Sequence, residues 1–121
     1  MTRSDELMLA AVNMRTDLAV NGRKVSVDGD DVIVSLHDMP VVRLRMGLGY
    51  LRICPGIPCT RKSSRVLNAV LEEYTDCRVR SLNGTWLLEQ GNTVIPFGNS
   101  MMLLQMHENV HRKTTPDGKV G

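Results

Sequence analysis

Cations gather around one turn near the middle of the chain. The segment 60–65, Thr-Arg-Lys-Ser-Ser-Arg, places three positive side chains and three hydroxyls at the start of a predicted helix. The first turn of a helix has backbone N–H groups without intrahelical partners, and the helix dipole favours anions there. The turn is therefore predicted to bind a phosphate or a carboxylate. The expected binding residues are Arg61, Lys62, Ser63 and Arg65.

Further arginines alternate along predicted strands. Residues two apart in a strand point to the same face of the sheet. If helices cover the apolar face, five arginines share the open face and form a basic surface of the kind that binds nucleic-acid phosphates. These arginines are Arg43, Arg45, Arg52, Arg78 and Arg80. The alternative is a solvated face whose charges are offset by acidic residues of nearby turns, namely Asp28, Asp30 and Asp31.

A zinc-peptidase pattern occurs near the end of the chain. Residues 107–111 read His-Glu-Asn-Val-His, and in zinc peptidases such a pair of histidines binds the metal while the glutamate polarises water. Little chain follows to supply a third ligand, and so small a domain has no second lobe to form a substrate groove. The sequence favours a chance match in a solvated tail, with no catalytic residue and no cofactor.

A structural zinc site is a related alternative. Its ligands would be Cys54, Cys59, His107 and His111, in C-x4-C and H-x3-H spacing. Two prolines inside the cysteine pair argue against a standard zinc knuckle. A small zinc-binding protein or an HExxH metallopeptidase remains the alternative function.

Composition indicates one domain without a disulfide framework. The chain has 121 residues, three scattered cysteines and a net charge of +2, so its overall charge does not favour nucleic acid. Residues 41–80 carry eight Lys or Arg against three Asp or Glu, whereas residues 1–40 carry four against seven. The cysteine usage and the lack of a signal or membrane-spanning pattern predict a cytoplasmic protein that does not bind membranes.

The apolar pattern predicts an α+β fold. Helical spacing over 2–20 indicates an N-terminal helix that ends at Asn21-Gly22, and a clear apolar face follows the basic turn as a central helix. Between and after these helices the period changes to two. The predicted strands are 24–27, 32–36, 41–45, 50–54, 77–82, 85–89 and 93–97. We expect a mostly antiparallel, twisted sheet with the central helix on one face and the N-terminal helix beside it.

The predicted domain spans residues 1–106, with 1–22 as the N-terminal helix and 23–106 as the sheet and central helix. Residues 107–121 are predicted to be a polar tail. The apolar segment 101–106 is helix or strand, and it is apolar enough to suggest a homodimer.

A string of spaced features resembles a group of small bacteriophage-encoded proteins of unknown function. The features lie between about residues 32 and 104 and include the basic turn, Leu67-Asn68, Gly84-Thr85-Trp86 and 97–101, Phe-Gly-Asn-Ser-Met. The resemblance implies a virus-encoded accessory protein in the cytoplasm of a host cell, and it brings no catalytic residues. The sequence therefore predicts a non-enzymatic protein that binds nucleic acid, or an acidic host protein or nucleoprotein complex whose action it blocks.

Overall fold

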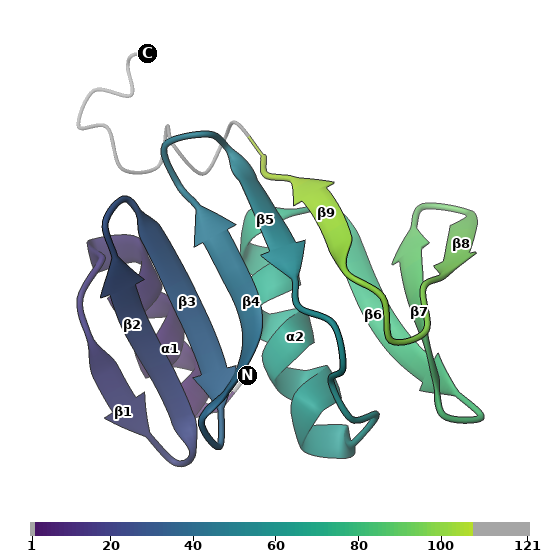
Figure 1. Cartoon of the computed structure of the whole chain (residues 1–121), viewed down its shortest axis with the longest axis horizontal. Helices are drawn as coiled ribbons and strands as arrows, with labels where there is room; N and C mark the ends of the chain where they lie inside the picture. The colour runs from purple at the N-terminus through teal and green to yellow at the C-terminus, as the bar shows by residue number, and fades with distance from the viewer. Residues whose placement is uncertain (1, 108–121) are drawn as a thin grey trace.

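The computed structural model describes residues 2–107, which form an α+β fold (Figure 1). The elements are α1 (Arg3–Met14), β1 (Leu18–Val20), β2 (Arg23–Asp28), β3 (Asp31–Leu36), β4 (Met39–Arg45), β5 (Tyr50–Ile53), α2 (Arg61–Tyr74), β6 (Cys77–Leu82), β7 (Thr85–Gln90), β8 (Thr93–Pro96) and β9 (Met102–Gln105). All the strand pairs in this part of the chain are antiparallel. The predicted fold class is confirmed.

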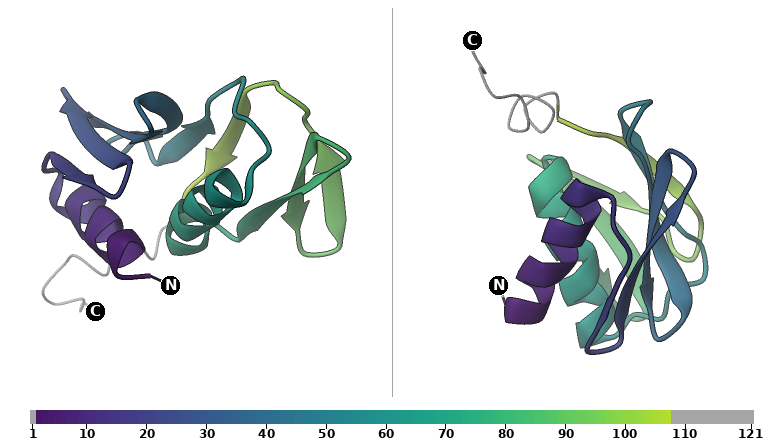
Figure 2. Two further views of the ribbon diagram at one scale, coloured as in Figure 1. Left: turned by 90° about the horizontal axis from the view of Figure 1, so that it is seen from below. Right: turned by 90° about the vertical axis from the view of Figure 1, so that its left-hand side faces the viewer.

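The strands form two sheets rather than the one that the sequence suggested. The larger sheet has the order β1-β2-β3-β4-β5-β9, and the smaller has the order β6-β7-β8. Both helices pack on the same face of the larger sheet, and its other face is uncovered by helices (Figures 1 and 2). The smaller sheet lies beyond α2 and β9 (Figure 1). The division matters for function because it separates arginines that the sequence placed on one surface.

Alternating apolar residues of the central strands meet the apolar face of α2. Val42, Leu44, Leu51 and Ile53 are fully buried, as are the residues that gave α2 its helical period. Those α2 residues are Val66, Leu67, Val70, Leu71 and Tyr74. Burial of this area is the main term that holds α2 against the sheet, since most helical stability in proteins comes from tertiary packing.

Asn68 joins α2 to the smaller sheet. Its amide donates to the carbonyl of Val79 at 3.0 Å and accepts from the N–H of the same residue at 2.7 Å. The side chain therefore satisfies the free edge of β6 as a neighbouring strand would. From β7 of the same sheet, the buried indole of Trp86 donates to the Ile57 carbonyl at 2.8 Å. Together these bonds fix the smaller sheet beside α2.

The N-terminal helix is shorter than the predicted 2–20. It ends at Met14 because Arg15 takes a left-handed conformation (φ 53°), and the N–H groups of Arg15 and Thr16 bond back to the last turn. Leu18–Val20 is the edge strand β1 instead, and residues 21 and 22 are its turn into β2. The prediction of one helix over 2–20 was wrong at its end, because the apolar residues 18–20 pair with β2 as a strand.

The undecided segment 101–106 contains β9, which pairs with β5 and completes the larger sheet. His107 continues this connection by donating its N–H to the Tyr74 carbonyl at 2.8 Å. Neither α1 nor α2 is long and apolar enough to cross a membrane.

Candidate anion-binding site

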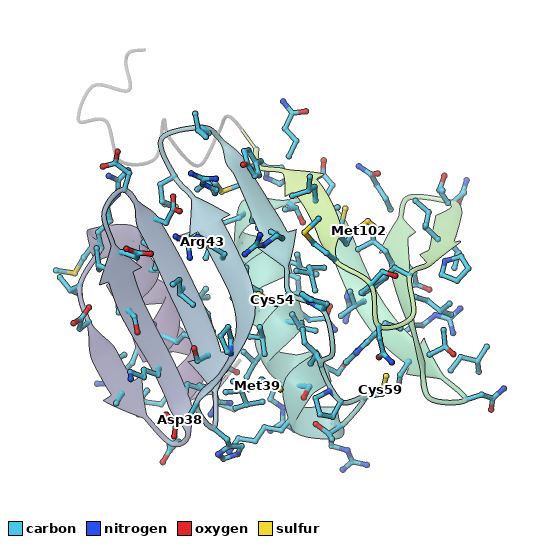
Figure 3. All side chains as sticks on the ribbon, in the orientation of Figure 1. Asp38, Met39, Arg43, Cys54, Cys59 and Met102 are labelled. Atoms are coloured by element: carbon cyan, nitrogen blue, oxygen red, sulfur yellow. The ribbon has the colours of Figure 1, made fainter. Side chains whose placement is uncertain are left out.

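The predicted arginines of the larger sheet do lie on its open face. Arg43 and Arg52 are direct cross-strand neighbours of β4 and β5, and Arg45 follows on the same side. Figure 3 looks onto this face and shows Arg43 over β4. The sequence was right about the direction of these three side chains.

Carboxylates of the β2–β3 hairpin pair with two of these arginines. Arg43 contacts Asp28 and Asp31, both at 2.8 Å, and Arg45 contacts Asp31 at 3.1 Å. Burial raises the pKa of Asp31, but the hydrogen bonds and charges of the two arginines outweigh it and hold the pKa below its usual value. Asp31 therefore stays ionised at neutral pH. The alternative that acidic residues of nearby turns offset the arginine charges is therefore correct here for Asp28 and Asp31. Asp30 makes no ion pair among the described residues.

Arg52 lies beside Cys54 on this face. Burial raises the pKa of the Cys54 thiol, and the nearby charges of Arg52 and Arg43 reverse only part of the shift. The thiol is consequently protonated at neutral pH and is a poor nucleophile. The Nε atom of Arg52 is buried and has no hydrogen-bond partner within residues 2–107.

Arg78 and Arg80 do not join this surface, so the prediction of one five-arginine face is wrong. Both lie on β6 of the smaller sheet. Arg78 pairs with Glu72 of α2 at 3.3 Å, and Arg80 pairs with Glu89 of β7 at 2.5 Å. The alternation placed each arginine on a face, but it did not show which sheet the strand would join.

The start of α2 keeps its positive charge. Within residues 2–107, Arg61, Lys62 and Arg65 make no ion pair. Thr60 caps the helix by accepting from the Ser63 N–H at 3.0 Å, and the two hydroxyls bond at 2.8 Å. Ser63 is buried by this arrangement, so its hydroxyl is a structural group and not the ligand donor that the sequence predicted.

These cations border an open recess of about 400 Å³, which we call the end recess. Its lining residues are Thr2, Ser4, Asn21, Arg23, Arg61, Lys62 and Arg65. They come from the start of α1, the β1–β2 turn and the start of α2, which lie at the same end of the molecule (Figures 1 and 2). None of them is a carboxylate, so the recess combines four cations with neutral donors.

Two helix N-termini converge at the end recess. Thr2 caps α1, as Thr60 caps α2. In the described part of the chain, the first two backbone N–H groups of each helix have no hydrogen-bond partner. The positive ends of two helix dipoles thus add to the charge of the side chains.

Arg23, which forms one wall of the end recess, is held from behind by a buried ion pair with Asp5. Arg23 is 5% exposed and donates from Nε to Asp5 at 2.9 Å, while its Nη1 donates to the Asn21 carbonyl at 3.2 Å. Asn21 in turn donates from its side chain to the Ser4 hydroxyl. The wall is therefore held in one arrangement before any ligand binds.

Gly22 lets the α2 cation approach the same wall. It has a positive φ of 79°, and a Cβ here would lie 2.6 Å from the His37 ring and 3.2 Å from Lys62 Nζ. Lys62 Nζ lies 3.4 Å from His37 Nε2. A larger residue would be strained at this φ and would have to displace the His37 ring, so glycine is favoured here.

A second depression of about 600 Å³, the side recess, runs along the exposed side of α2. Arg61 and Arg65 line both recesses, whereas Lys62 lines the end recess and Arg78 lines the side recess. Glu72 and Asp5 also line the side recess, so it is less positive than the end recess. The start of α2 is the ridge between the two depressions.

Within residues 2–107, no three His, Cys, Asp or Glu side chains come close enough to hold a metal ion. Cys54 and Cys59 lie apart (Figure 3), and His107 instead contacts Asp76 at 2.6 Å. These three predicted ligands are therefore not brought together. His111 and the remainder of the HExxH pattern lie outside the described residues.

Sequence reasoning missed the residues that complete the end recess, namely Thr2, Ser4, Asn21 and Arg23. Thr2 and Ser4 had a signal, because Thr and Ser ahead of an amphipathic segment are typical helix caps. Their position beside Arg61 depends on the packing of α1 against α2, which no local pattern reports.

No protein-family model, curated protein or solved structure matches this chain. The resemblance to small bacteriophage proteins stays a prediction, and the chemistry of the two recesses is the basis for assigning a function.

Proposed function

We propose that this protein binds the phosphate groups of a nucleic acid, without catalysing a reaction, through the surface at the start of α2. One observation carries the proposal: Arg61, Lys62 and Arg65 form no ion pair in the described part of the chain. Four of the five predicted strand arginines are paired with carboxylates, and Arg52 is the exception. Unpaired cations are available to replace the counterions of a polyanion.

The donors around these cations favour phosphate over an apolar or cationic ligand. The end recess adds hydroxyls, a side-chain amide and unpaired backbone N–H groups to the charge. Such groups contact phosphate oxygens in nucleic-acid complexes and position the protein without reading sequence. We therefore expect binding with little sequence preference. An acidic host protein is the competing partner, and it becomes the favoured one if nucleic acid fails to bind.

The setting that we propose is the cytoplasm of an infected bacterium, as the resemblance to bacteriophage proteins suggests. A homodimer is also proposed, because Met101, which precedes β9, and Leu103 in β9 expose 47% and 55% of their surface. A monomeric mass by light scattering would exclude the dimer while leaving the binding proposal intact.

Fluorescence anisotropy with single-stranded and duplex oligonucleotides tests the function. The variant Arg61→Gln/Arg65→Gln loses two cations from the ridge, and the control Lys24→Gln/Arg80→Gln loses the same charge elsewhere. For a single strand, the slope of log K against log salt is about −0.7 for each phosphate contacted, so the ridge variant should flatten it by about 1.4. The control should keep the natural slope within the error of the measurement.

Equal slopes for the two variants would show that overall charge, and not the ridge, attracts the ligand. Absence of binding by the natural protein at about 20 mM salt, where such contacts are strongest, would refute the nucleic-acid function.

A further inference from the structure

The end recess differs from the side recess in charge. Arg23 and Asp5 neutralise each other, which leaves Arg61, Lys62 and Arg65 uncompensated around the end recess within the described residues. A phosphate monoester carries about −1.5 to −2 at pH 7, whereas the diester of a nucleic-acid backbone carries about −1. The excess positive charge therefore suits the monoester better than the diester.

The directions of the donors lead to the same ligand. Polar groups approach the end recess from three separate elements, at the starts of α1 and α2 and at the β1–β2 turn. A terminal phosphate has three free oxygens to accept from such groups, while a diester has two and must also leave space for chain on both sides. Donors that come from three elements suit a group at the end of a chain.

Part of the recess is also preorganised. Arg23, one of its cations, is only 5% exposed and is held by Asp5 and the Asn21 carbonyl. Lys62 reaches across Gly22 to His37 and is thereby directed to the same end of the molecule. Arg23 and Lys62 therefore need little further ordering when an anion enters, whereas Arg61 and Arg65 are exposed and would be ordered by the ligand.

We propose that the end recess binds the terminal phosphate of a nucleic-acid strand, and that the strand then passes over Arg61 and Arg65 along the side recess. The inference rests on the proposed function, and it adds that the protein prefers phosphorylated strand ends. Arg61 and Arg65 contact both parts of the ligand, because they line both recesses.

One oligonucleotide in three forms tests the inference: with a 5′-phosphate, with a 3′-phosphate and with hydroxyls at both ends. At about 150 mM salt we expect one phosphorylated form to bind about tenfold more tightly than the hydroxyl form, since the terminal phosphate adds charge-assisted hydrogen bonds that the hydroxyl cannot make. The form that binds tightly identifies the polarity of the strand.

Two single variants form a matched pair. Lys62→Gln changes only the end recess and should reduce the preference for the phosphorylated form to less than about threefold, with hydroxyl-ended binding nearly unchanged. Arg78→Gln changes only the side recess, where it leaves Glu72 without its partner, and should weaken all three forms by a similar factor. Both positions are on the surface, so neither variant should prevent folding, which circular dichroism would verify.

Equal affinity for the three forms would overturn the inference and leave the proposed function standing. Loss of the preference in Arg78→Gln but not in Lys62→Gln would also overturn it, because the terminal phosphate would then lie in the side recess. If no form binds, both the inference and the nucleic-acid function are refuted.

Discussion

Replacement of Asp5 by Asn should destabilise the protein while it strengthens anion binding. Asp5 is the partner of Arg23, and the two side chains are 2% and 5% exposed with 2.9 Å between Oδ1 and Nε. The variant removes the negative charge but keeps an oxygen that can accept from Arg23. It therefore leaves a buried guanidinium without its counter-charge next to the end recess.

The expected loss of stability is large for one substitution. Removing one member of a buried ion pair costs about 3 to 5 kcal/mol. Because the asparagine side chain retains an acceptor, we place the loss at the lower end, about 3 kcal/mol. Domains of this size are stable by about 5 to 15 kcal/mol, so the variant should still fold at 25 °C.

Urea denaturation measures this loss, with Asp30→Asn as the control. Asp30 is exposed in the β2–β3 turn and makes no ion pair within residues 2–107, so the control changes the same charge without affecting a pair. We expect a lower unfolding midpoint for Asp5→Asn at an unchanged m-value. Oligonucleotide affinity should rise in Asp5→Asn, because Arg23 adds a net charge to the end recess.

A stability loss in Asp5→Asn no greater than that of Asp30→Asn would refute the energetic reasoning. Weaker oligonucleotide binding by folded Asp5→Asn would refute the assignment of the end recess as the anion site. The two results are independent, because one is read from unfolding and the other from binding to the folded chain.

Two further predictions concern the framework of the sheets. Asn68→Ala leaves the N–H and the carbonyl of Val79 without their partner, and it should lower the free energy of unfolding, measured in urea, by about 2 kcal/mol. The control Asn99→Ala, at an exposed position, should change the unfolding midpoint little. Equal midpoints for the two variants would show that water replaces the amide. Asp31 has a pKa lowered in the folded state from its usual 3.8, so its contribution to stability is present above that pH and is lost as the pH falls through the folded value. The stability difference between the natural chain and Asp31→Asn should thus be constant above about pH 5 and shrink toward about pH 2, and a difference that grows on acidification would contradict the assignment.

Much of the local structure could be predicted from the sequence. The period of 3.6 in α2 and its cap at Thr60 follow from residues that interact within one or two turns. The alternation in β4 and β5 likewise predicted that Arg43 and Arg52 point away from the buried valines and leucines. These features depend on neighbours in the chain, so the sequence contains their cause.

The partners of the charged residues could not be predicted in the same way. Arg43 and Arg78 are both arginines on alternating strands, yet one meets a β-hairpin carboxylate and the other meets Glu72 of α2. An ion pair depends on which elements are neighbours in space. Alternation along a strand predicts the face on which a side chain lies, but it does not predict which sheet the strand joins. The helical pattern over 2–20 failed for the same reason, because β1 exists only by pairing with β2.

The sequence by itself determined that three cations stand at the entrance of a helix, since a cap, a basic turn and an apolar period are local properties of 60–74. Only the tertiary structure decided that these cations stay unpaired among the described residues and that Thr2, Ser4 and Arg23 join them. The physical reason is that packing both helices on one face of the larger sheet brings their N-termini together, and that packing is driven by buried area contributed along the whole chain.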